Sequence, residues 1–234
     1  MNSAVQHMLG VTAREDGHLE EAEVHFRRAA EAGHGGAMGS LGSLLDDMGQ
    51  AAEAELWSRR AVDAAPTPGA MNNLGVVLYH SGRSGEAEQW WTRAADAGEV
   101  NAMFSLGGLA DAEGRTETAE RWYRRAGRAG STDAMLNLGI LLTRTGRARE
   151  AERWYRRGAE GGHVPAMVNL GCALAASGIE DEAERWMRRA ADAGDANAML
   201  NLSTMLLGRG RRGGAAWWRQ RAAEAVEAAG KSKT

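Results

Sequence analysis

The chain has 234 residues, of which 44% are hydrophobic, so it can form one large or two small domains and is not a disordered protein. Its formal net charge of −3 provides no field strong enough to gather nucleic acid or an anionic membrane, and neither is expected as a partner. A single cysteine, no leader-like start and no apolar run of the roughly 18 residues that a membrane span requires lead us to expect a cytoplasmic protein.

The dipeptide Ala-Met returns at nearly constant spacing along the chain. It places methionine at Met38, Met71, Met103, Met135, Met167 and Met199, with intervals of 33, 32, 32, 32 and 32 residues. A tryptophan follows each methionine by 19 residues, at Trp57, Trp90, Trp122, Trp154, Trp186 and Trp218. The N-terminal segment is a weaker seventh copy, in which Gln6 and His25 occupy the methionine and tryptophan places. A fixed period of this length is typical of a repeat protein.

Each copy predicts two helices separated by a short turn, most clearly in the fifth copy. Its first half places Met135, Leu138, Leu141 and Leu142 on one helical stripe, which Gly146 ends. The same glycine recurs as Gly17, Gly49, Gly82, Gly114, Gly178 and Gly210, as expected where a helix ends in a left-handed residue. The second half pairs Glu152 with Arg156 four residues later, and this step recurs in four other copies. We expect the second helix to lie on the outside, with this charged face in water.

A second glycine, or Ala65-Pro66 in the second copy, ends the outer helix before the next Ala-Met. The expected repeats are therefore about 1–33, 34–66, 67–98, 99–130, 131–162, 163–194 and 195–230, followed by a basic tail at 231–234. Small residues recur where two helices would cross, and the Met and Trp ladders are expected to fill the core. The sequence predicts an all-α fold, a right-handed α-α superhelical solenoid of about seven 32-residue helix-turn-helix repeats forming a single domain.

These residues resemble two related families, the tetratricopeptide repeat and the Sel1-like repeat, and we suspect a bacterial source. The Leu-Gly pair, the turn glycine, the alanine after it and the aromatic at Phe26, Tyr123 and Tyr155 are similar to the tetratricopeptide pattern. The block WYRRA, followed by Gly and a new Ala-Met, resembles the Sel1-like pattern. The resemblance covers nearly the whole chain. It implies a scaffold whose first helices line a concave surface that binds a partner protein.

Helical spacing predicts which residues would face such a partner. Positions one, five, eight and nine after each methionine share a helix face, which is apolar in the middle and later repeats and acidic in the second. Beside it an asparagine recurs two residues after methionine, either to tie one hairpin to the next or to offer a peptide backbone a donor and an acceptor. The apolar residues of this face could equally be core between repeats. The candidate peptide-binding residues are Asn73, Asn137, Asn169, Asn201, Tyr79, Phe104, Leu136, Ile140, Arg144 and Val168.

No arrangement of residues suits catalysis, a cofactor or a metal, since the six histidines form no metal-ligand motif and the glycines follow helices instead of a strand. One row of arginines, at Arg83, Arg115, Arg147 and Arg211, follows the turn glycines and would suit an acidic peptide tail. The sequence thus predicts a non-enzymatic protein- or peptide-binding scaffold or adaptor. The alternative is a structural solenoid that self-associates as a dimer or filament, possible as a homo-oligomer through exposed terminal repeats.

Overall fold

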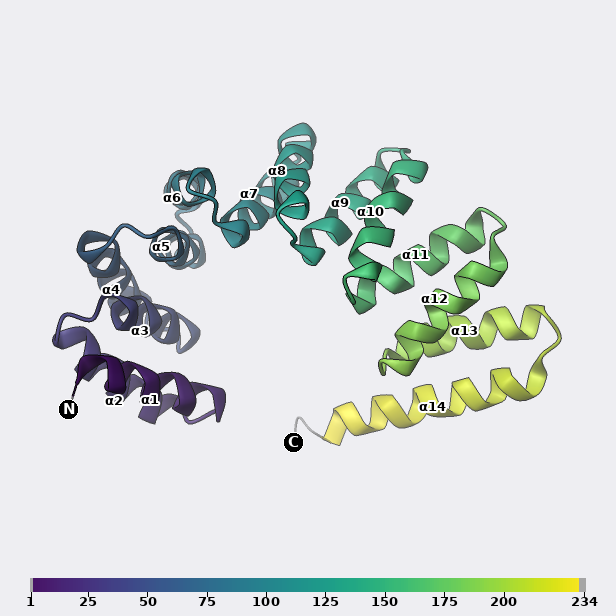
Figure 1. Cartoon of the computed structure of the whole chain (residues 1–234), viewed down its shortest axis with the longest axis horizontal. Helices are drawn as coiled ribbons and strands as arrows, with labels where there is room; N and C mark the ends of the chain where they lie inside the picture. Colours follow the sequence, from purple (N-terminus) through teal and green to yellow (C-terminus); the bar gives the residue numbers. More distant parts are fainter. Residues whose placement is uncertain (1, 232–234) are drawn as a thin grey trace. The chain divides into compact units, whose positions relative to one another are not determined.

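The computed structural model describes residues 2–231, and this part of the chain is entirely helical, as the sequence predicts (Figure 1). Of the expected basic tail, residues 232–234 lie outside the described residues. The helices are α1 (Ser3–Glu15), α2 (Leu19–Glu31), α3 (Gly35–Asp47), α4 (Ala51–Ala64), α5 (Pro68–His80), α6 (Ser84–Asp96), α7 (Val100–Ala112), α8 (Thr116–Arg128), α9 (Thr132–Arg144), α10 (Ala148–Glu160), α11 (Val164–Ala176), α12 (Glu180–Asp192), α13 (Ala196–Gly208) and α14 (Arg212–Lys231). Odd-numbered helices are the first helices of the repeats, and even-numbered helices are the second.

The chain divides into two compact units, Met1–Trp122 and Tyr123–Thr234, with the division inside α8. In the first unit α1 packs on α2, α3 on α4 and α5 on α6, and the hairpins join through α2 with α3, α4 with α5, and α6 with α7. The second unit repeats this scheme with the hairpins α9–α10, α11–α12 and α13–α14. Neighbouring first helices also touch, α3 with α5 and α9 with α11. Each unit is therefore a stack of helical hairpins, the arrangement of a solenoid.

Glycines in the left-handed conformation end the helices, as the sequence predicts. Gly146 has a φ of 77°, and the next amide, Arg147 N–H, donates to the Leu142 carbonyl at 2.8 Å to close the end of α9. The glycines between repeats behave alike, with φ of 85° at Gly162 and 93° at Gly194. In α14 the next inter-repeat glycine would fall 32 residues after Gly194, but that position is Val226. Because no glycine ends the helix there, α14 continues to Lys231.

A glycine on the first helix meets a large side chain of the second helix where the two cross. A Cβ added at Gly75 would lie 2.5 Å from Trp91 Nε1, and one added at Gly139 would lie 2.6 Å from Tyr155 Cδ1. Real Cβ atoms do not approach other atoms so closely, so only glycine allows these helices to pack at this distance. The expectation that small residues lie at the helix crossings is confirmed at these positions.

The tryptophan ladder is less buried than expected. Trp57, Trp154 and Trp218 are 4–6% exposed, but Trp90, Trp122 and Trp186 are only half-buried. In four repeats the following residue directly opposes the glycine of the first helix and is at most 4% exposed: Phe26, Trp91, Tyr155 and Met187. Tyr123, at the same place, is 2% exposed. The ladder tryptophan lies beside this position, and an arginine three residues later covers its ring, with Arg93 Cζ 4.2 Å from the Trp90 ring centre and Arg189 Cζ 4.5 Å from that of Trp186. The prediction that all six tryptophans form the core is therefore wrong for three of them.

Candidate functional site

The surface of interest is the face of the first helices that carries two rows of residues. The first row follows each methionine directly and comprises Gly39, Asn72, Phe104, Leu136, Val168 and Leu200. The second row lies five residues after each methionine and comprises Ser43, Val76, Gly108, Ile140, Cys172 and Thr204. Half of these twelve residues are half-buried and four are exposed, among them the apolar Ile140 at 44%. We call this surface the first-helix face.

Two members of the first row, Gly39 and Asn72, are buried. Asn72 is only 9% exposed, and its carbonyl oxygen accepts a hydrogen bond of 3.3 Å from the indole N–H of Trp91. The expectation that every residue of this row faces a partner is thus wrong at Asn72. The large indole of Trp91 on α6 packs against this turn of α5 and encloses it.

The ten predicted binding residues are divided between the two units. Asn73, Tyr79 and Phe104 lie in the first unit, and Leu136, Asn137, Ile140, Arg144, Val168, Asn169 and Asn201 lie in the second. In the second unit, Leu136, Ile140 and Arg144 follow one another at four-residue steps on α9, so they share one face of that helix. Tyr79, Ile140 and Arg144 are exposed, and the other seven are half-buried.

The recurring asparagines form hydrogen bonds within their own helices where the structure shows their bonds. Asn169 Nδ2 donates to the Pro165 carbonyl at 2.9 Å, and Asn73 Oδ1 accepts a long bond of 3.5 Å from Asn72 Nδ2. Neither bond joins one hairpin to the next, which was the structural role considered from the sequence. Asn169 retains its amide oxygen, and Asn73 its amide nitrogen, for another partner.

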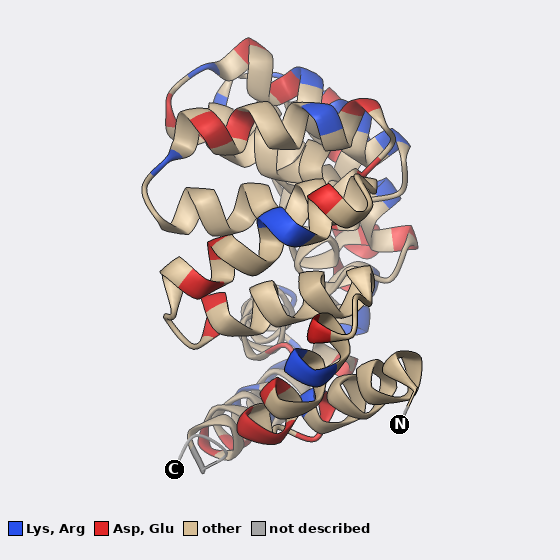
Figure 2. Ribbon diagram, turned by 90° about the vertical axis from the view of Figure 1, so that its left-hand side faces the viewer, with Lys and Arg blue, Asp and Glu red and all other residues tan. Residues whose placement is uncertain are grey.

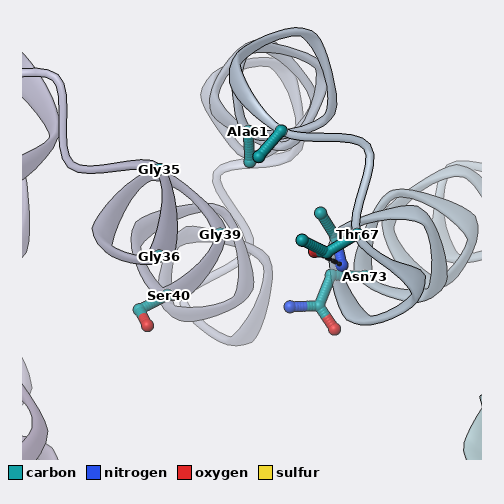
Figure 3. Close-up of a pocket in the computed structure, with 9 residues that line it drawn as sticks. Gly35, Gly36, Gly39, Ser40, Ala61, Thr67 and Asn73 are labelled. Carbon is teal, nitrogen blue, oxygen red and sulfur yellow. Dashed lines mark hydrogen bonds between the residues drawn. The ribbon is translucent and has the colours of Figure 1, made fainter.

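Two pockets open on the first-helix face of the first unit, and sequence reasoning missed both. The first, of about 240 Å³, lies between α3 and α5 below α4 (Figure 3). Gly39 and Ser40 line one side of it, and Thr67 and Asn73 line the other. Gly39 occupies the first-row place that Phe104, Leu136 or Val168 fills in later repeats. Glycine at a position that holds a large side chain in later repeats is the feature of the sequence that could have predicted this pocket.

The second pocket, of about 250 Å³, lies between α5 and α7. Its walls include Tyr79 and Trp91, whose ring centres are 5.6 Å apart, and its lining includes Gly108 of the second row. Ile140 fills the equivalent place on α9. Glycine in either row therefore coincides with a pocket, and the predicted residue Tyr79 contributes to this one.

Comparison with known proteins identifies the repeat. Family models described as tetratricopeptide repeat match residues 41–101, residues 132–161, and residues 3–28 with 100–125, which together exceed half of the chain. The crystal structure of a Sel1 repeat protein from Oxalobacter formigenes is similar, with 29% identity, a TM-score of 0.68, and coverage of 92% of this chain and 98% of that chain. The chain belongs to the tetratricopeptide repeat proteins and is similar to a Sel1 repeat protein. Members of this group generally bind other proteins and serve as scaffolds.

Other similar structures support the fold alone. The structure of Pseudomonas aeruginosa pilF has 17% identity and a TM-score of 0.64, and the alignment covers 79% of this chain and 88% of that one. A crystal structure of MamA has 19% identity and a TM-score of 0.55, with coverage of 68% of this chain and 97% of that chain. The comparison with curated proteins gave no match.

The polar residues on the first-helix face of this repeat protein pair with one another across neighbouring helices. Arg14 Nη2 lies 2.6 Å from Asp47 Oδ2, and His80 Nδ1 lies 2.7 Å from Asp46 Oδ2. The acidic end expected from the sequence is therefore matched by an arginine and a histidine on the adjoining first helices. A partner would meet carboxylates that already bond to an arginine and a histidine there.

A histidine contacts Ser40, one of the residues that line the first pocket. His7 Nε2 and Ser40 Oγ are 3.0 Å apart, and the His7 ring centre lies 4.8 Å from that of His34. Burial, and then the neighbouring His34, lower the pKa of His7 below its ordinary value of 6.5. This shift favours the neutral form of the His7 ring.

The second helices carry a ladder of ion pairs that runs from one repeat to the next. Arg27 bridges Glu23 at 2.8 Å and Glu53 at 2.9 Å, and Arg156 binds both Glu152 and Glu182. Hydrogen bonds from arginines lower the pKa of several of these carboxyl groups, as Arg124 does for Glu150. Acidic and basic residues accordingly mix along the helices in Figure 2.

This ladder also contains the arginines that follow the turn glycines. Arg83 binds Glu55 at 2.7 Å, Arg115 binds Glu88 at 2.8 Å, Arg147 binds Glu150 at 2.6 Å and Arg211 binds Glu184 at 2.8 Å. The expectation that this row awaits an acidic peptide is therefore wrong, because glutamates of the same or the preceding second helix already neutralise it. Three of these four bonds join residues that are 27 or 28 positions apart, which a comparison of residues three and four positions apart does not show.

Other classes of site were sought among residues 2–231. Within them, no three His, Cys, Asp or Glu side chains group in a way that could hold a metal ion. None of the described helices combines the length and apolar character needed to cross a bilayer. Burial raises the pKa of the Cys172 thiol, which disfavours the reactive thiolate.

Proposed function

We propose that the chain is a non-enzymatic scaffold or adaptor that binds an extended segment of a partner protein along its first-helix face. The observation that carries this proposal is the contrast between the two faces. The first-helix face exposes apolar side chains, open pockets and amides, whereas many charged residues of the second helices pair with one another. Apolar surface left in water is stabilised when a partner covers it.

The second unit shows what such a segment would meet. Leu136 and Ile140 on α9 and Val168 on α11 offer apolar contacts, and α9 and α11 are adjacent. Covering the exposed part of one such side chain is worth on the order of 1 kcal/mol at about 25 cal/mol per Å². Asn137 and Asn169 lie beside them and can hydrogen-bond the peptide groups of an extended chain, as each amide has both donors and an acceptor. The apolar contacts supply affinity, and the amides fix the path of the segment.

A binding assay on matched variants tests this proposal. A peptide selected from a random 12-residue library against the full chain is titrated into the wild type and into an Asn73→Ala, Asn137→Ala, Asn169→Ala variant, which removes the asparagine of the row from both units. Alanine is the better helix former, so this variant should remain folded. The control variant is Arg149→Ala, Arg153→Ala, which changes two exposed residues of the second helix α10. We expect weaker binding by roughly tenfold or more for the asparagine variant alone. Equal binding by both folded variants would refute the assignment of this face.

Self-association is the second candidate function, and one exposed aromatic favours it. Trp217 on α14 is 49% exposed and meets Trp218 edge-on, with ring centres 4.5 Å apart. The equivalent residue is an arginine in the three preceding repeats. Sedimentation velocity over a hundredfold concentration range separates the two candidates. A binding scaffold stays monomeric, whereas a structural solenoid forms larger species that a Trp217→Arg variant disrupts.

A further inference from the structure

Gly39 stands in the middle of α3 without a packing reason to be glycine. A glycine inside a helix costs roughly 1 kcal/mol relative to alanine, so its presence needs an explanation. At Gly75 and Gly139 the explanation is the large side chain of the second helix, which leaves no room for a Cβ. A Cβ at Gly39 would instead meet its nearest neighbours, Asn73 Nδ2 and Ala61 Cβ, at ordinary distances of 3.8 and 3.9 Å. What the glycine does achieve is to leave the first pocket open.

The chemistry of this pocket is polar and uncharged. Alanines from α4 and α5 line it, and Asn73 faces Gly39 across it, as Figure 3 shows. The Asn73 Nδ2 group, which has no bond to another residue in the described chain, is a donor directed at the place where a Gly39 side chain would be. No charged residue lines the pocket, so a carboxylate placed there would lose its water without gaining a counter-charge. A neutral carbonyl acceptor on a short apolar stem fits both the alanines and the donor.

The second pocket is different in character. Tyr79 and Trp91 form an aromatic corner, and the indole N–H of Trp91 is already used by the Asn72 carbonyl. The rest of the lining is Val76, Leu109 and Gly108, with His80 and Ser105 as its polar members. His80 already bonds Asp46, so most of the wall is apolar. A volume of about 250 Å³ is far more than the roughly 10–15 Å³ that one water needs. This pocket therefore suits a bulky apolar side chain.

We propose that the first unit recognises two side chains of one extended peptide, an Asn or Gln in the Gly39 pocket and a Leu, Met or Phe in the Tyr79–Trp91 pocket. This deepens the proposed function and rests on it, because it names the residues that the bound segment carries.

The spacing can be worked out from α5, which separates the two pockets. Asn73 and Tyr79 are six residues apart, which is about 9 Å along the helix axis. The pockets lie on opposite sides of α5, so they are offset across it by about one interhelical distance of 8–10 Å. The diagonal of about 13 Å corresponds to about four residues of extended chain. Residues four apart in an extended chain point to the same side, so both side chains can enter their pockets together.

The test begins with a phage library of random 12-residue peptides selected against the full chain. The expected consensus has Asn or Gln four positions from Leu, Met or Phe. Gly39→Leu fills the first pocket, and Gly108→Ile fills the second with the residue that α9 carries there. Gly69→Leu is the matched control, because no atom lies within 4 Å of a Cβ at Gly69 and it lines neither pocket. Circular dichroism melting establishes that each variant is folded, and Gly39→Ala replaces Gly39→Leu if the larger residue unfolds the chain.

Affinities of a synthetic consensus peptide then decide the matter. Gly39→Leu should bind it about tenfold more weakly than wild type and Gly69→Leu equally well. Replacing the amide residue of the peptide by alanine should weaken binding to wild type but not to Gly39→Leu, which ties that residue to that pocket. If peptides are enriched without the paired residues, or if Gly39→Leu binds like wild type, the inference is overturned while the proposed function stands. If no peptide is enriched, the proposed function itself is overturned.

Discussion

Replacing Gly139 by alanine tests whether glycine at the helix crossings holds the hairpins together. A Cβ at Gly139 would lie 2.6 Å from Cδ1 and 2.8 Å from Cζ of the Tyr155 ring, which is 4% exposed. The ring cannot turn away freely, because the Tyr155 hydroxyl lies 3.2 Å from Thr143 Oγ1. Overpacking costs about 1–3 kcal/mol and loss of the hydrogen bond about 1, against a gain of about 1 in helix propensity. We expect a net loss of about 1–3 kcal/mol.

The matched variant is Gly171→Ala, at the same place two helices later. There the added Cβ would meet Met187, lying 2.8 Å from its Cε atom and 2.9 Å from its Cγ atom. Methionine has three rotatable bonds and can move aside, so the steric cost is offset by helix propensity and the net change is close to zero.

Urea unfolding and thermal melting of both variants provide the readout. One kcal/mol shifts the unfolding temperature by about 2–4 °C in a chain of this size. Gly139→Ala should therefore melt several degrees below wild type, and Gly171→Ala close to it. A Gly139→Ala, Tyr155→Met double variant pairs alanine with methionine, as Gly171→Ala does with Met187. It should recover part of the stability that Gly139→Ala loses. Equal stabilities of the two single variants would refute the reasoning that the rigid ring excludes a Cβ.

Three further predictions concern stability. Trp154→Ala should cost about 3–5 kcal/mol by urea unfolding and the half-buried Trp186→Ala clearly less, whereas equal losses would show that burial does not rank the ladder. The Glu184 carboxyl group binds three arginines, and Glu184→Gln should cost about 1–2 kcal/mol in low salt and less in high salt, so a salt-independent loss would contradict an ionic role. Burial lowers the pKa of His7 below 6.5, so near this pH the folded state binds fewer protons than the unfolded state. The free energy of unfolding should therefore be highest above pH 6.5 and fall as the pH drops below that value. His7 faces Phe26, His34 and Ser40, and a His7→Asn variant should flatten this part of the pH profile in thermal melts at pH 5–8.

The helix ends and the buried helix faces of each repeat could be predicted from the sequence, because they depend on residues close together in the chain. Turn glycines such as Gly146 must adopt a left-handed backbone, and the stripe from Met135 to Leu142 must face a partner helix. The order of burial within the second helix was less accessible. Trp154 and Tyr155 are adjacent, and a rotation of one residue along the helix decides which of them opposes the glycine.

The candidate site was only partly predictable for a similar reason. The rows of the first-helix face follow from helical spacing, but the burial of Asn72 depends on the size of Trp91 from another helix. The neutralisation of Arg83 depends on Glu55, 28 residues earlier, which becomes a neighbour only when hairpins stack. Pockets arise where a row lacks a side chain, so Gly39 and Gly108 become informative only beside the filled positions of other repeats.

Hydrogen–deuterium exchange with a library-selected peptide tests most directly which face of the protein binds its partner. Spectra of the free and peptide-bound full chain are compared segment by segment, with a scrambled peptide as control. Binding to the first-helix face should slow exchange in the first helices and leave α10, which lines neither pocket, unchanged. Protection confined to the second helices would contradict the assignment and place the binding surface on the ladder of ion pairs.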